Sequence, residues 1–396
     1  MPKNSSQTPE HPSIRVSRRG ANRLREGHVW VYRSDLLDDK AAPGALVRVT
    51  DERGKPLGMA LYSSSSQIAI RMISSNPVHD LAALLRRRIA DAVSYREKLV
   101  RNTDSYRVIF SEADFLPGLI VDRYNDILSL QILTQAMDSE DARHAILSEV
   151  VEQFHPAGIA ERVDARVREL ESLPPRNSGL IEGEKSRTTI NMNGLRFHYD
   201  AAEGQKTGAF LDQRENYAAT MGYAHGEALD VFCYQGGFAL HLANSCSRVT
   251  GVDSSRPALE IADQNATLNG RDIEWIEANA FDLLKDYASA GRQYDTIVLD
   301  PPAFAKSKRN LETALRGYKE LNLRAMKMLR PGGVLVTCSC SYHVSEAEFL
   351  AMIAGAAADS HKQARIIEKR GQAMDHPILA TVPETAYLKC VILTVS

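Results

Sequence analysis

Long apolar runs, paired cysteines and a strong excess of either charge are all missing from this chain of 396 residues. No run of about 18 apolar residues occurs, so we expect no transmembrane helix. Residues 1–11 are polar and lack the apolar core of a secretory signal peptide, so we expect a cytoplasmic protein without a membrane partner. The formal net charge of −2 excludes a uniformly basic nucleic-acid binder, although it leaves room for a local basic face.

The cysteines are too few and too scattered for a disulfide framework, and their number is odd. The five are Cys233, Cys246, Cys338, Cys340 and Cys390. Cys338 and Cys340 form a C-x-C pair, but no second cysteine pair or histidine pair follows at the spacing of a zinc site. We therefore expect reduced thiols and no bound metal.

The remaining composition, 44% apolar and 25% charged, is typical of a globular protein, and the length indicates two or three domains. The charge is uneven, because residues 1–75 carry 12 basic and 7 acidic side chains, whereas both later parts are acidic overall. Five arginines open the basic part and precede the aromatic residues Trp30 and Tyr32; they are Arg15, Arg18, Arg19, Arg23 and Arg25. The N-terminal part is therefore the candidate for nucleic-acid binding.

Alternating apolar and polar residues predict a small β-barrel-like module over residues 1–77, followed by a central α+β domain over 78–195. The predicted strands are 45–50, 57–62 and 67–73 in the first part and 107–109, 119–122 and 127–132 in the second. Helices are predicted at 78–100 and 140–154. The Pro-, Gly- and Ser-rich residues 172–186 are expected to form a flexible loop near the boundary with the last domain.

Strands and helices alternate in the last domain, residues 196–396. The predicted strands are 228–233, 248–253, 274–277, 296–300 and 333–339, and the predicted helices are 238–244, 256–269 and 312–329. This alternation predicts an α/β fold with a mostly parallel sheet and helices on both faces. In such sheets ligands bind outside the carboxyl ends of the strands.

The first of these strands runs through Tyr234 into Gly236 and Gly237, which allow close approach of a ligand to the backbone at a helix start. The second strand ends in Asp253, whose carboxylate can accept both hydroxyls of a ribose. The pattern lacks the full G-x-G-x-x-G that wraps a pyrophosphate, so S-adenosylmethionine is the favoured cofactor. Asn279, after the third strand, could contact the adenine. The alternative is that the glycines only form a turn.

Residues 300–304 read Asp-Pro-Pro-Ala-Phe and follow the fourth strand. The two prolines stiffen the loop, so Asp300 would face the ligand in a fixed orientation and Phe304 could stack on a base. Cys340 ends the fifth strand, where an activated thiolate could attack carbon 6 of a pyrimidine. The alternatives are a simple turn for the proline loop and ordinary core packing for the cysteine.

Basic residues follow the proline loop closely: Lys306, Lys308, Arg309, Arg316, Lys319, Arg324 and Lys327. They predict either a surface that contacts RNA phosphates beside the active site or simply a solvated helix face.

Four segments together resemble a known family. They are residues 27–32 (GHVWVY), 110–124 (FSEADFLPGLIVDRY), 206–214 (KTGAFLDQR) and 339–341 (SCS). Through them, nearly the whole chain from about residue 14 resembles the bacterial S-adenosylmethionine-dependent methyltransferases of large-subunit ribosomal RNA that carry a PUA domain and methylate carbon 5 of a cytosine. The resemblance implies a PUA RNA-binding domain, a central α+β domain, a C-terminal Rossmann-like methyltransferase domain, and 23S ribosomal RNA as the partner.

Roles for individual residues follow from the resemblance and the strand-end positions. RNA contacts of the PUA domain would come from Arg15, Arg18, Arg19, Arg23 and Trp30. Cofactor contacts would come from Phe210, Gln213, Arg214, Tyr234, Gly236, Gly237, Asp253, Asn279 and Asp300. Substrate contacts would come from Pro301, Pro302, Phe304, Lys306, Lys308 and Arg309. Cys340 would be the nucleophile and Asp300 its catalytic neighbour, while Cys338 would not react.

Related RNA cytosine methyltransferases release their product with a second cysteine in the Asp-Pro-Pro position, and this chain has none there. Release would therefore use a base that the sequence does not identify. Two other functions stay open: a methyltransferase for guanine or adenine without a nucleophilic cysteine, and a non-catalytic ribosome-assembly factor with a methyltransferase fold. The state of assembly is open too, with a homodimer as one option.

Overall fold

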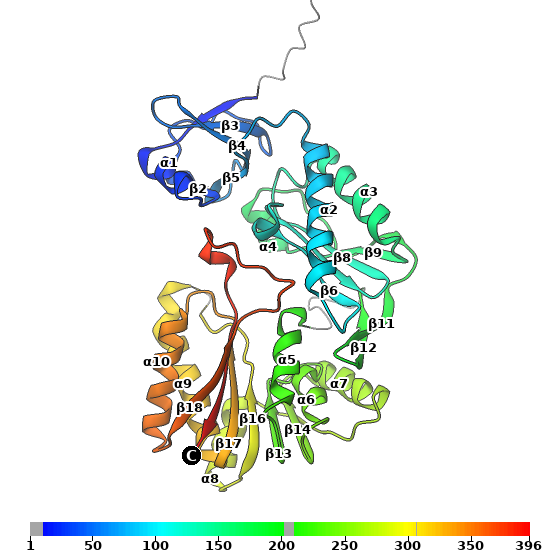
Figure 1. Ribbon diagram of the computed structural model, residues 1–396, viewed down its shortest axis with the longest axis vertical. Coiled ribbons are helices and arrows are strands. Elements are labelled where there is room, and N and C mark those ends of the chain that lie inside the picture. Colours follow the sequence, from blue (N-terminus) through cyan, green and yellow to red (C-terminus); the bar gives the residue numbers. More distant parts are fainter. Residues whose placement is uncertain (1–10, 202–209, 306) are drawn as a thin grey trace, which may run out of the picture.

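The computed structural model describes residues 11–201, 210–305 and 307–396, which form three sheets and a connecting hairpin. Figure 1 shows the N-terminal sheet at the top, the central domain beside and below it, and the C-terminal domain at the bottom. Within the described part of the chain, no helix is long and apolar enough to cross a membrane. The same residues contain no group of three or more His, Cys, Asp or Glu side chains arranged to hold a metal ion.

The N-terminal sheet has the strand order β1-β3-β4-β5-β2. Its elements are β1 (Ser13–Arg15), α1 (Arg18–Arg25), β2 (Trp30–Tyr32), β3 (Leu46–Thr50), β4 (Pro56–Tyr62) and β5 (Ile68–Ser74). The three strands predicted from alternation correspond to β3, β4 and β5. The arginine-rich segment forms a helix that the alternation did not predict; it begins where the side chain of Ser17 accepts a hydrogen bond from the amide of Gly20.

The central sheet has the order β10-β9-β8-β7-β6, with α2 and α3 packed against each other beside it. Its elements are α2 (Leu81–Leu99), β6 (Ser105–Phe110), β7 (Leu119–Tyr124), β8 (Ile127–Ile132), α3 (Glu140–Phe154), β9 (Gly158–Glu161), α4 (Ala165–Leu170) and β10 (Gly179–Gly183). The loop predicted over 172–186 is wrong in part, because it contains β10, which pairs antiparallel with β9. Most side chains of this edge strand are exposed, so it has no alternation for sequence analysis to detect.

A hairpin of β11 (Arg187–Met192) and β12 (Leu195–Asp200) links the central and C-terminal domains. The boundary expected after residue 195 falls inside β12. The buried face of the hairpin packs on both neighbours: the ring of Tyr199 stacks on Tyr124 with centroids 3.8 Å apart, and Phe197 joins the cluster that contains Phe238. The hairpin therefore belongs to the packing of both domains.

The C-terminal sheet has the order β15-β14-β13-β16-β17-β19-β18. Its strands are β13 (Glu227–Val231), β14 (Arg248–Asp253), β15 (Glu274–Glu277), β16 (Tyr294–Leu299), β17 (Leu329–Ser339), β18 (Ala364–Arg370) and β19 (Lys389–Val395). Its helices are α5 (Arg214–Met221), α6 (Gly237–Leu242), α7 (Arg256–Leu268), α8 (Ala280–Ser289), α9 (Leu311–Met328) and α10 (Glu346–Asp359). The predicted mostly parallel sheet is confirmed, since only the contacts of β19 are antiparallel. The strand order reverses between β13 and β16, which is where such sheets bind ligands.

Short 3-10 turns complete the described secondary structure: Arg33–Asp35, Ser111–Asp114, Leu211–Gln213, Lys308–Asn310 and Pro383–Thr385. The last lies in residues 371–388, between β18 and β19, which we call the C-terminal strap. Figure 1 shows this strap, in red, rising from the C-terminal domain toward the other two domains. His28 of the N-terminal domain contacts Glu384 of the strap at 3.2 Å.

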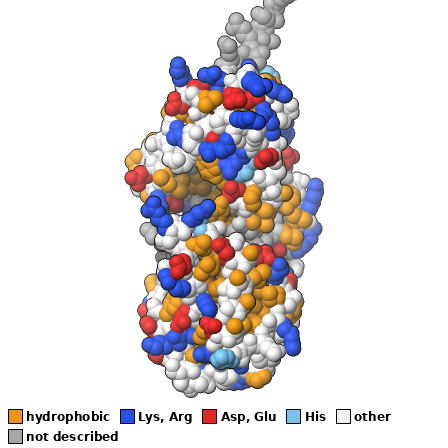
Figure 2. All heavy atoms as spheres, turned by 90° about the vertical axis from the view of Figure 1, so that its left-hand side faces the viewer, with side chains coloured by type: hydrophobic (Ala, Val, Ile, Leu, Met, Phe, Trp, Pro, Cys, Tyr) orange, Lys and Arg blue, Asp and Glu red, His pale blue; other side chains and the backbone are white. Residues whose placement is uncertain are grey.

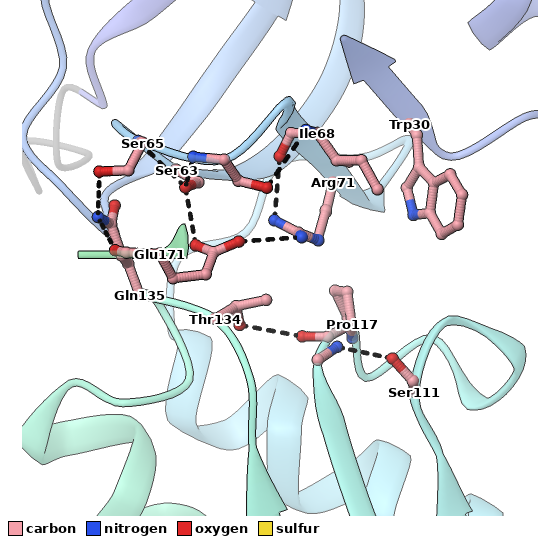
Figure 3. Close-up of polar contacts among 12 residues, drawn as sticks. Trp30, Ser63, Ser65, Ile68, Arg71, Ser111, Pro117, Thr134, Gln135 and Glu171 are labelled. Atoms are coloured by element: carbon pink, nitrogen blue, oxygen red, sulfur yellow. Dashed lines mark hydrogen bonds and ion pairs between the residues drawn. The ribbon is translucent and has the colours of Figure 1, made fainter. Parts of the chain in front are cut away.

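The N-terminal and central domains meet through a buried polar cluster, the N-terminal junction, made of Ser63, Arg71, Gln135 and Glu171 (Figure 3). Half-buried Glu112 lies beside it, 3.5 Å from Arg71. The carboxylate of Glu171 accepts from Arg71 at 3.1 Å and from the hydroxyl of Ser63 at 2.7 Å. Gln135 donates to the carbonyl of Glu171 at 2.6 Å. Because these partners come from both domains, the junction fixes their relative orientation.

Candidate functional site

A cavity of about 1070 Å³ lies between the central domain and the carboxyl ends of the C-terminal strands. The C-terminal domain contributes residues that follow four neighbouring strands: Tyr234, Asp253, Asp300 and Cys340. Phe210, Gln213, Pro301 and Pro302 line the cavity too. The structure thus brings together the predicted residues at the ends of four of these strands, although they span more than a hundred positions of sequence.

Asp253 closes β14 with its carboxylate held by backbone amides. One oxygen accepts from the amide of Tyr234 at 3.0 Å and the other from the amide of Ser255 at 2.8 Å. Each carboxylate oxygen has a second acceptor position. The side chain is therefore fixed at the cavity wall and can still accept from two hydroxyl groups.

The glycine turn after β13 serves the fold as well as the cavity. Gly236 has a φ of +86°, a left-handed conformation suited to glycine, and an added Cβ on Gly237 would lie 2.5 Å from the hydroxyl of Tyr217. Gly237 and Gln235 line a smaller cavity of about 20 Å³ next to Asp300, whereas Gly236 lines neither cavity. The Oε1 atom of Gln235 is buried without a hydrogen-bond partner in the described chain. An unpaired acceptor at this place suits a ligand that brings a donor.

Asp300 titrates close to neutral pH. Burial and the nearby carboxylate of Asp212 raise its pKa to about 7, although the amide of Gln213 donates to it at 2.9 Å. The side-chain amide of Asn216 donates to Oε1 of Gln213 at 2.6 Å, which fixes the orientation of the Gln213 amide. At neutral pH, Asp300 can therefore act either as a hydrogen-bond donor or as an acceptor.

Cys340 follows β17 between two serines that point away from the cavity. Both serine hydroxyls, of Ser339 and Ser341, hydrogen-bond to the phenol of Tyr318, at 3.0 and 2.9 Å. With its neighbours anchored on that side, Cys340 faces the cavity, its Sγ 4.0 Å from the carbonyl of Pro301. Burial and the carboxylates of Asp300 and Asp212 raise the pKa of the thiol to about 11.

Cys338 lies two residues earlier and has a different environment. It is fully buried and pairs in register with Cys390 of β19. Burial raises the pKa of its thiol well above the ordinary value. Both features are those of a core residue rather than a nucleophile.

Lys389 supports the turn after Cys340, and sequence analysis did not find it. Its ammonium group donates to the carbonyls of Ser341, Val344 and Tyr387 at 2.7, 2.8 and 2.9 Å. Burial lowers its pKa to about 8. A single lysine at the start of a strand carries no sequence signal for this role.

Besides the two glycines and the basic residues near α9, three residues predicted for the site lie outside the large cavity, and each has another partner nearby. Arg214 is buried and forms an ion pair with Asp375 of the C-terminal strap at 3.2 Å instead of lining the cofactor pocket. Asn279 caps α8, accepting from the amide of Phe281 at 2.9 Å. The ring of Phe304 packs on Tyr318, with centroids 4.7 Å apart. Their predicted ligand contacts are therefore not supported by this arrangement.

The predicted RNA contacts near α9 are spread over several environments. Lys306 lies outside the described residues. Lys308 lines a second cavity of about 690 Å³, and Arg309 is exposed. Further along, Arg316 and Lys319 form ion pairs with Glu312 at 3.4 Å and Asp359 at 2.7 Å, and Arg324 pairs with Glu320. These pairs fit the solvated helix face better than a phosphate-binding surface.

Of the N-terminal residues predicted to bind RNA, the arginines lie on or near the surface. Figure 2 shows Lys and Arg side chains gathered over the top of the molecule. Arg18 is exposed, Arg15 and Arg19 pair with Asp38 and Asp35 at 2.9 and 2.8 Å, and the guanidinium of Arg23 lies 4.7 Å from the ring centre of Tyr32. Trp30 differs, because its indole N–H donates to Glu112 at 3.0 Å, which places it beside the N-terminal junction.

The opposite wall of the cavity belongs to the central domain, and sequence analysis did not identify it. It includes Gln131, Arg162, Asp164, Arg166 and Ser178, while Asp212 lines the cavity from the C-terminal side. These residues lie in segments that read only as polar connections. Their proximity to the C-terminal strands depends on how the domains pack, which local sequence patterns do not encode.

Comparisons with known proteins agree with this architecture. Residues 14–75 match the family model of a PUA-like domain, and residues 120–392 match that of an S-adenosylmethionine-dependent methyltransferase. The chain is 37% identical over 383 residues to the ribosomal RNA large subunit methyltransferase I of Photobacterium profundum, covering 92% of this chain and 95% of the relative. It is 38% identical over 391 residues to the protein of that name from Klebsiella pneumoniae, covering 96% and 97%.

A solved structure of a putative methyltransferase complexed with SAH superposes on the chain with a TM-score of 0.84. It covers 97% of this chain and 100% of that chain at 18% sequence identity. At this identity the likeness concerns the fold, and it extends over all three domains.

Proposed function

This chain belongs to the S-adenosylmethionine-dependent methyltransferase family, and from this premise we propose that it methylates carbon 5 of a cytosine in 23S ribosomal RNA through a covalent adduct with Cys340. The predicted cofactor, S-adenosylmethionine, is confirmed by the family. The proposal of ribosomal RNA is supported by the names of relatives that are 37–38% identical over most of the chain and by the PUA-like domain. The predicted cytoplasmic location goes with that substrate.

The observation that carries the proposal is the position of Cys340. Its thiol shares one cavity with Asp253 and Asp300, and the flanking serines are turned away toward Tyr318. A cysteine that merely filled the core would resemble Cys338, which is fully buried. The placement therefore favours a cytosine methyltransferase over a guanine or adenine methyltransferase that has no use for a thiol.

The residues present fit the cofactor. Asp253 would accept from the ribose hydroxyls, and the unpaired Oε1 of Gln235 offers an acceptor beside the turn that follows β13. When bound, S-adenosylmethionine supplies an electrophilic methyl group. Tyr234 and Phe232, which line the same wall, would exclude water from it.

Cys340 would carry the covalent chemistry. Because its pKa is about 11, the thiol must first give its proton to solvent. Sγ then forms a bond to carbon 6 of the cytosine, and the electron pair of the π bond between carbons 5 and 6 moves to carbon 5. After carbon 5 has been methylated, a base takes its proton, and the electron pair of that bond restores the double bond between carbons 5 and 6. The bond between Sγ and carbon 6 then breaks with its electron pair on sulfur. The thiolate is released unchanged.

Asp300 would hold the pyrimidine. With a pKa of about 7, its ionised form accepts from the exocyclic amine of cytosine, and its protonated form can donate to the ring nitrogen. Uracil presents a carbonyl in place of the amine and a protonated ring nitrogen. This pairing would therefore discriminate cytosine from uracil.

The experiment compares wild-type protein with Cys340→Ala and, as a matched control, Cys246→Ser, in methyl transfer to 23S ribosomal RNA fragments. Cys246 is half-buried and lies away from the cavity. We expect Cys340→Ala to lose at least about 10³-fold in rate while it still binds S-adenosylhomocysteine in calorimetry. Nucleoside mass spectrometry should identify 5-methylcytidine with the other two proteins.

Other results would replace the proposal. Retained turnover by Cys340→Ala would exclude the covalent scheme, and a methylated guanosine or adenosine would give the protein a different target. If wild-type protein bound RNA but neither bound the cofactor nor transferred a methyl group, a non-catalytic assembly role would be the better account.

A further inference from the structure

The two walls of the large cavity carry opposite net charge. The wall from the C-terminal domain presents the carboxylates of Asp212, Asp253 and Asp300. The wall from the central domain presents one carboxylate, Asp164, and the guanidinium groups of Arg162 and Arg166, which are the basic side chains that line the cavity in the described part of the chain. The cavity is thus polarised between its two domains.

Both arginines come from one edge of the central sheet. Arg162 follows β9 directly, and Arg166 is the second residue of α4. Because β8 and β9 run parallel, Gln131 at the end of β8 lies at the same edge, and Ser178 just before β10 joins it. Two cations and two neutral hydrogen-bond donors therefore face the carboxylate wall together. Asp164, between the arginines, caps α4 by accepting from the amide of Val167 at 3.0 Å.

The folding of the central domain accounts for a neighbouring arginine but not for Arg166. Arg168 is buried, donating to the carbonyl of Pro174 at 2.6 Å and to Asp138 at 3.0 Å. Arg166, two residues earlier, is exposed at the cavity, and no ion pair joins it to another residue of the described chain. Its charge is available to a ligand.

Arg162 acts across the cavity. Burial raises the pKa of the Tyr234 phenol, and the charge of Arg162 opposes that rise, so its guanidinium lies within electrostatic range of the opposite wall. Tyr234 belongs to the turn after β13, where the cofactor is expected. A ligand between the two walls would therefore meet Arg162 from the central domain and carboxylates from the C-terminal domain.

Guanidinium groups bind oxyanions with two parallel hydrogen bonds, which carboxylates cannot provide. Both ligands of the proposed reaction carry an oxyanion, since S-adenosylmethionine has a carboxylate and RNA has phosphates. The volume of about 1070 Å³ slightly exceeds the roughly 300–1000 Å³ typical of single-ligand pockets, so there is room for the cofactor and a nucleotide together.

We propose that Arg162 and Arg166 form an oxyanion-binding site, which the central domain contributes to the methyl-transfer cavity. This inference rests on the proposed function for the identity of the two ligands. The site would hold a carboxylate or a phosphate against the carboxylate-lined C-terminal wall, and it gives the central domain a part in ligand binding.

The test uses Arg162→Gln and Arg166→Gln in the full chain, with Arg248→Gln as a control that makes the same change of charge. Arg248 is exposed at the start of β14, at the end of the strand opposite to Asp253. Calorimetry measures affinity for S-adenosylhomocysteine and for 5′-methylthioadenosine, which lacks the carboxylate. Filter binding measures affinity for a 23S ribosomal RNA fragment across a salt series.

If the oxyanion is the cofactor carboxylate, we expect about tenfold weaker binding of S-adenosylhomocysteine and unchanged binding of 5′-methylthioadenosine. If it is a phosphate, we expect about tenfold weaker RNA binding, with a salt slope lower by about one, and unchanged binding of both nucleosides. Either pattern supports the site, and Arg248→Gln should show neither.

Unchanged affinity for all three ligands in both variants would overturn the inference. That failure differs from failure of the proposed function. An enzyme that makes 5-methylcytidine with wild-type affinities in both variants lacks only the oxyanion site. A protein that loses S-adenosylhomocysteine affinity in Arg162→Gln but does not methylate cytosine keeps the site and lacks the proposed reaction.

Discussion

At the N-terminal junction, charged side chains of the central domain pair with residues of the N-terminal domain. At the large cavity, on the other side of the central domain, charges of both signs face each other across open space. The short helix α4 and its end contribute to both: Glu171 accepts from Arg71 and Ser63 in the first, and Arg166 lines the second. Glu171, whose carboxylate is hydrogen-bonded within the protein, thus lies only five positions after Arg166, which is available to a ligand.

The difference indicates how each surface is used. Buried polar groups that satisfy one another fix the orientation of two domains. Polar groups that face a cavity without satisfying one another are typical of ligand sites. We therefore expect substitutions at paired clusters to lower stability with little change in catalysis, and substitutions at the cavity to do the reverse.

The largest stability effect is expected at Asp375 of the C-terminal strap, a paired site beside the cavity. Its carboxylate accepts from Arg214 and from the amide of Arg107, and both side chains of the Arg214–Asp375 pair are buried. Asp375→Asn would leave the buried Arg214 charge without its buried counterion and with the partly exposed carboxylate of Glu215, at 3.2 Å, as its remaining ion-pair partner among the described residues. We therefore expect a loss of about 3 kcal/mol in the free energy of unfolding, measured by denaturant titration.

The control for Asp375 is Glu346→Gln, which breaks the exposed pair with Lys369 and should change stability by less than about 1 kcal/mol. Equal stability of Asp375→Asn and the control would show that the pair of Arg214 with Asp375 does not stabilise the fold.

A smaller loss is expected at the N-terminal junction. Glu171→Gln removes the negative charge facing Arg71, which keeps Glu112 at 3.5 Å as a second partner. We expect a loss of about 2 kcal/mol and an unchanged kcat, measured by thermal unfolding and single-turnover methylation. Glu169→Gln, on the exposed side of the same helix, is the control. A fall in kcat without a loss of stability would place this junction among the functional surfaces.

Asp300→Asn should show the opposite pattern. We expect methylation to fall by about 10²-fold or more, because the acid or base form of Asp300 is lost, while stability stays the same or rises. Between pH 4 and 7 the folded protein keeps a proton on Asp300 that the unfolded chain releases, since its pKa is raised to about 7 from an ordinary 3.8. This carboxyl group therefore makes stability fall as pH rises through that range.

Denaturant titrations at pH 5 and pH 7 measure this contribution. The free energy of unfolding at pH 7 minus that at pH 5 should be larger for Asp300→Asn than for the wild-type protein. An identical pH dependence in the two proteins would mean that Asp300 is not the group with the raised pKa.

Sequence patterns predicted the parts of the molecule that depend on local order. The alternation of strands and helices identified β13 to β17, and the rule for parallel sheets placed Asp253, Asp300 and Cys340 at one edge. The helix over Glu140–Phe154 was predicted to the residue, because its apolar positions recur at helical spacing between clear ends.

The parts that sequence patterns missed depend on contacts between distant segments. Arg214 belongs to a motif expected at the cofactor, but Asp375, far along the chain, takes up its guanidinium. The cavity wall with Arg162 and Arg166 exists only because the central domain packs over the C-terminal strand ends. Asn279 caps α8, a role that the sequence analysis did not consider, because a polar residue after a strand can equally cap the following helix.

The most direct test of the account is capture of the Cys340 adduct on an RNA fragment in which the target cytosine carries fluorine at carbon 5. The fluorine cannot leave as a proton does, so the bond between Sγ and carbon 6 should persist after methyl transfer. We predict a denaturant-resistant protein–RNA complex that requires S-adenosylmethionine, maps to Cys340 by peptide mass spectrometry and is absent in Cys340→Ala. Methylation of unmodified RNA with no such complex on the fluorinated fragment would contradict the account.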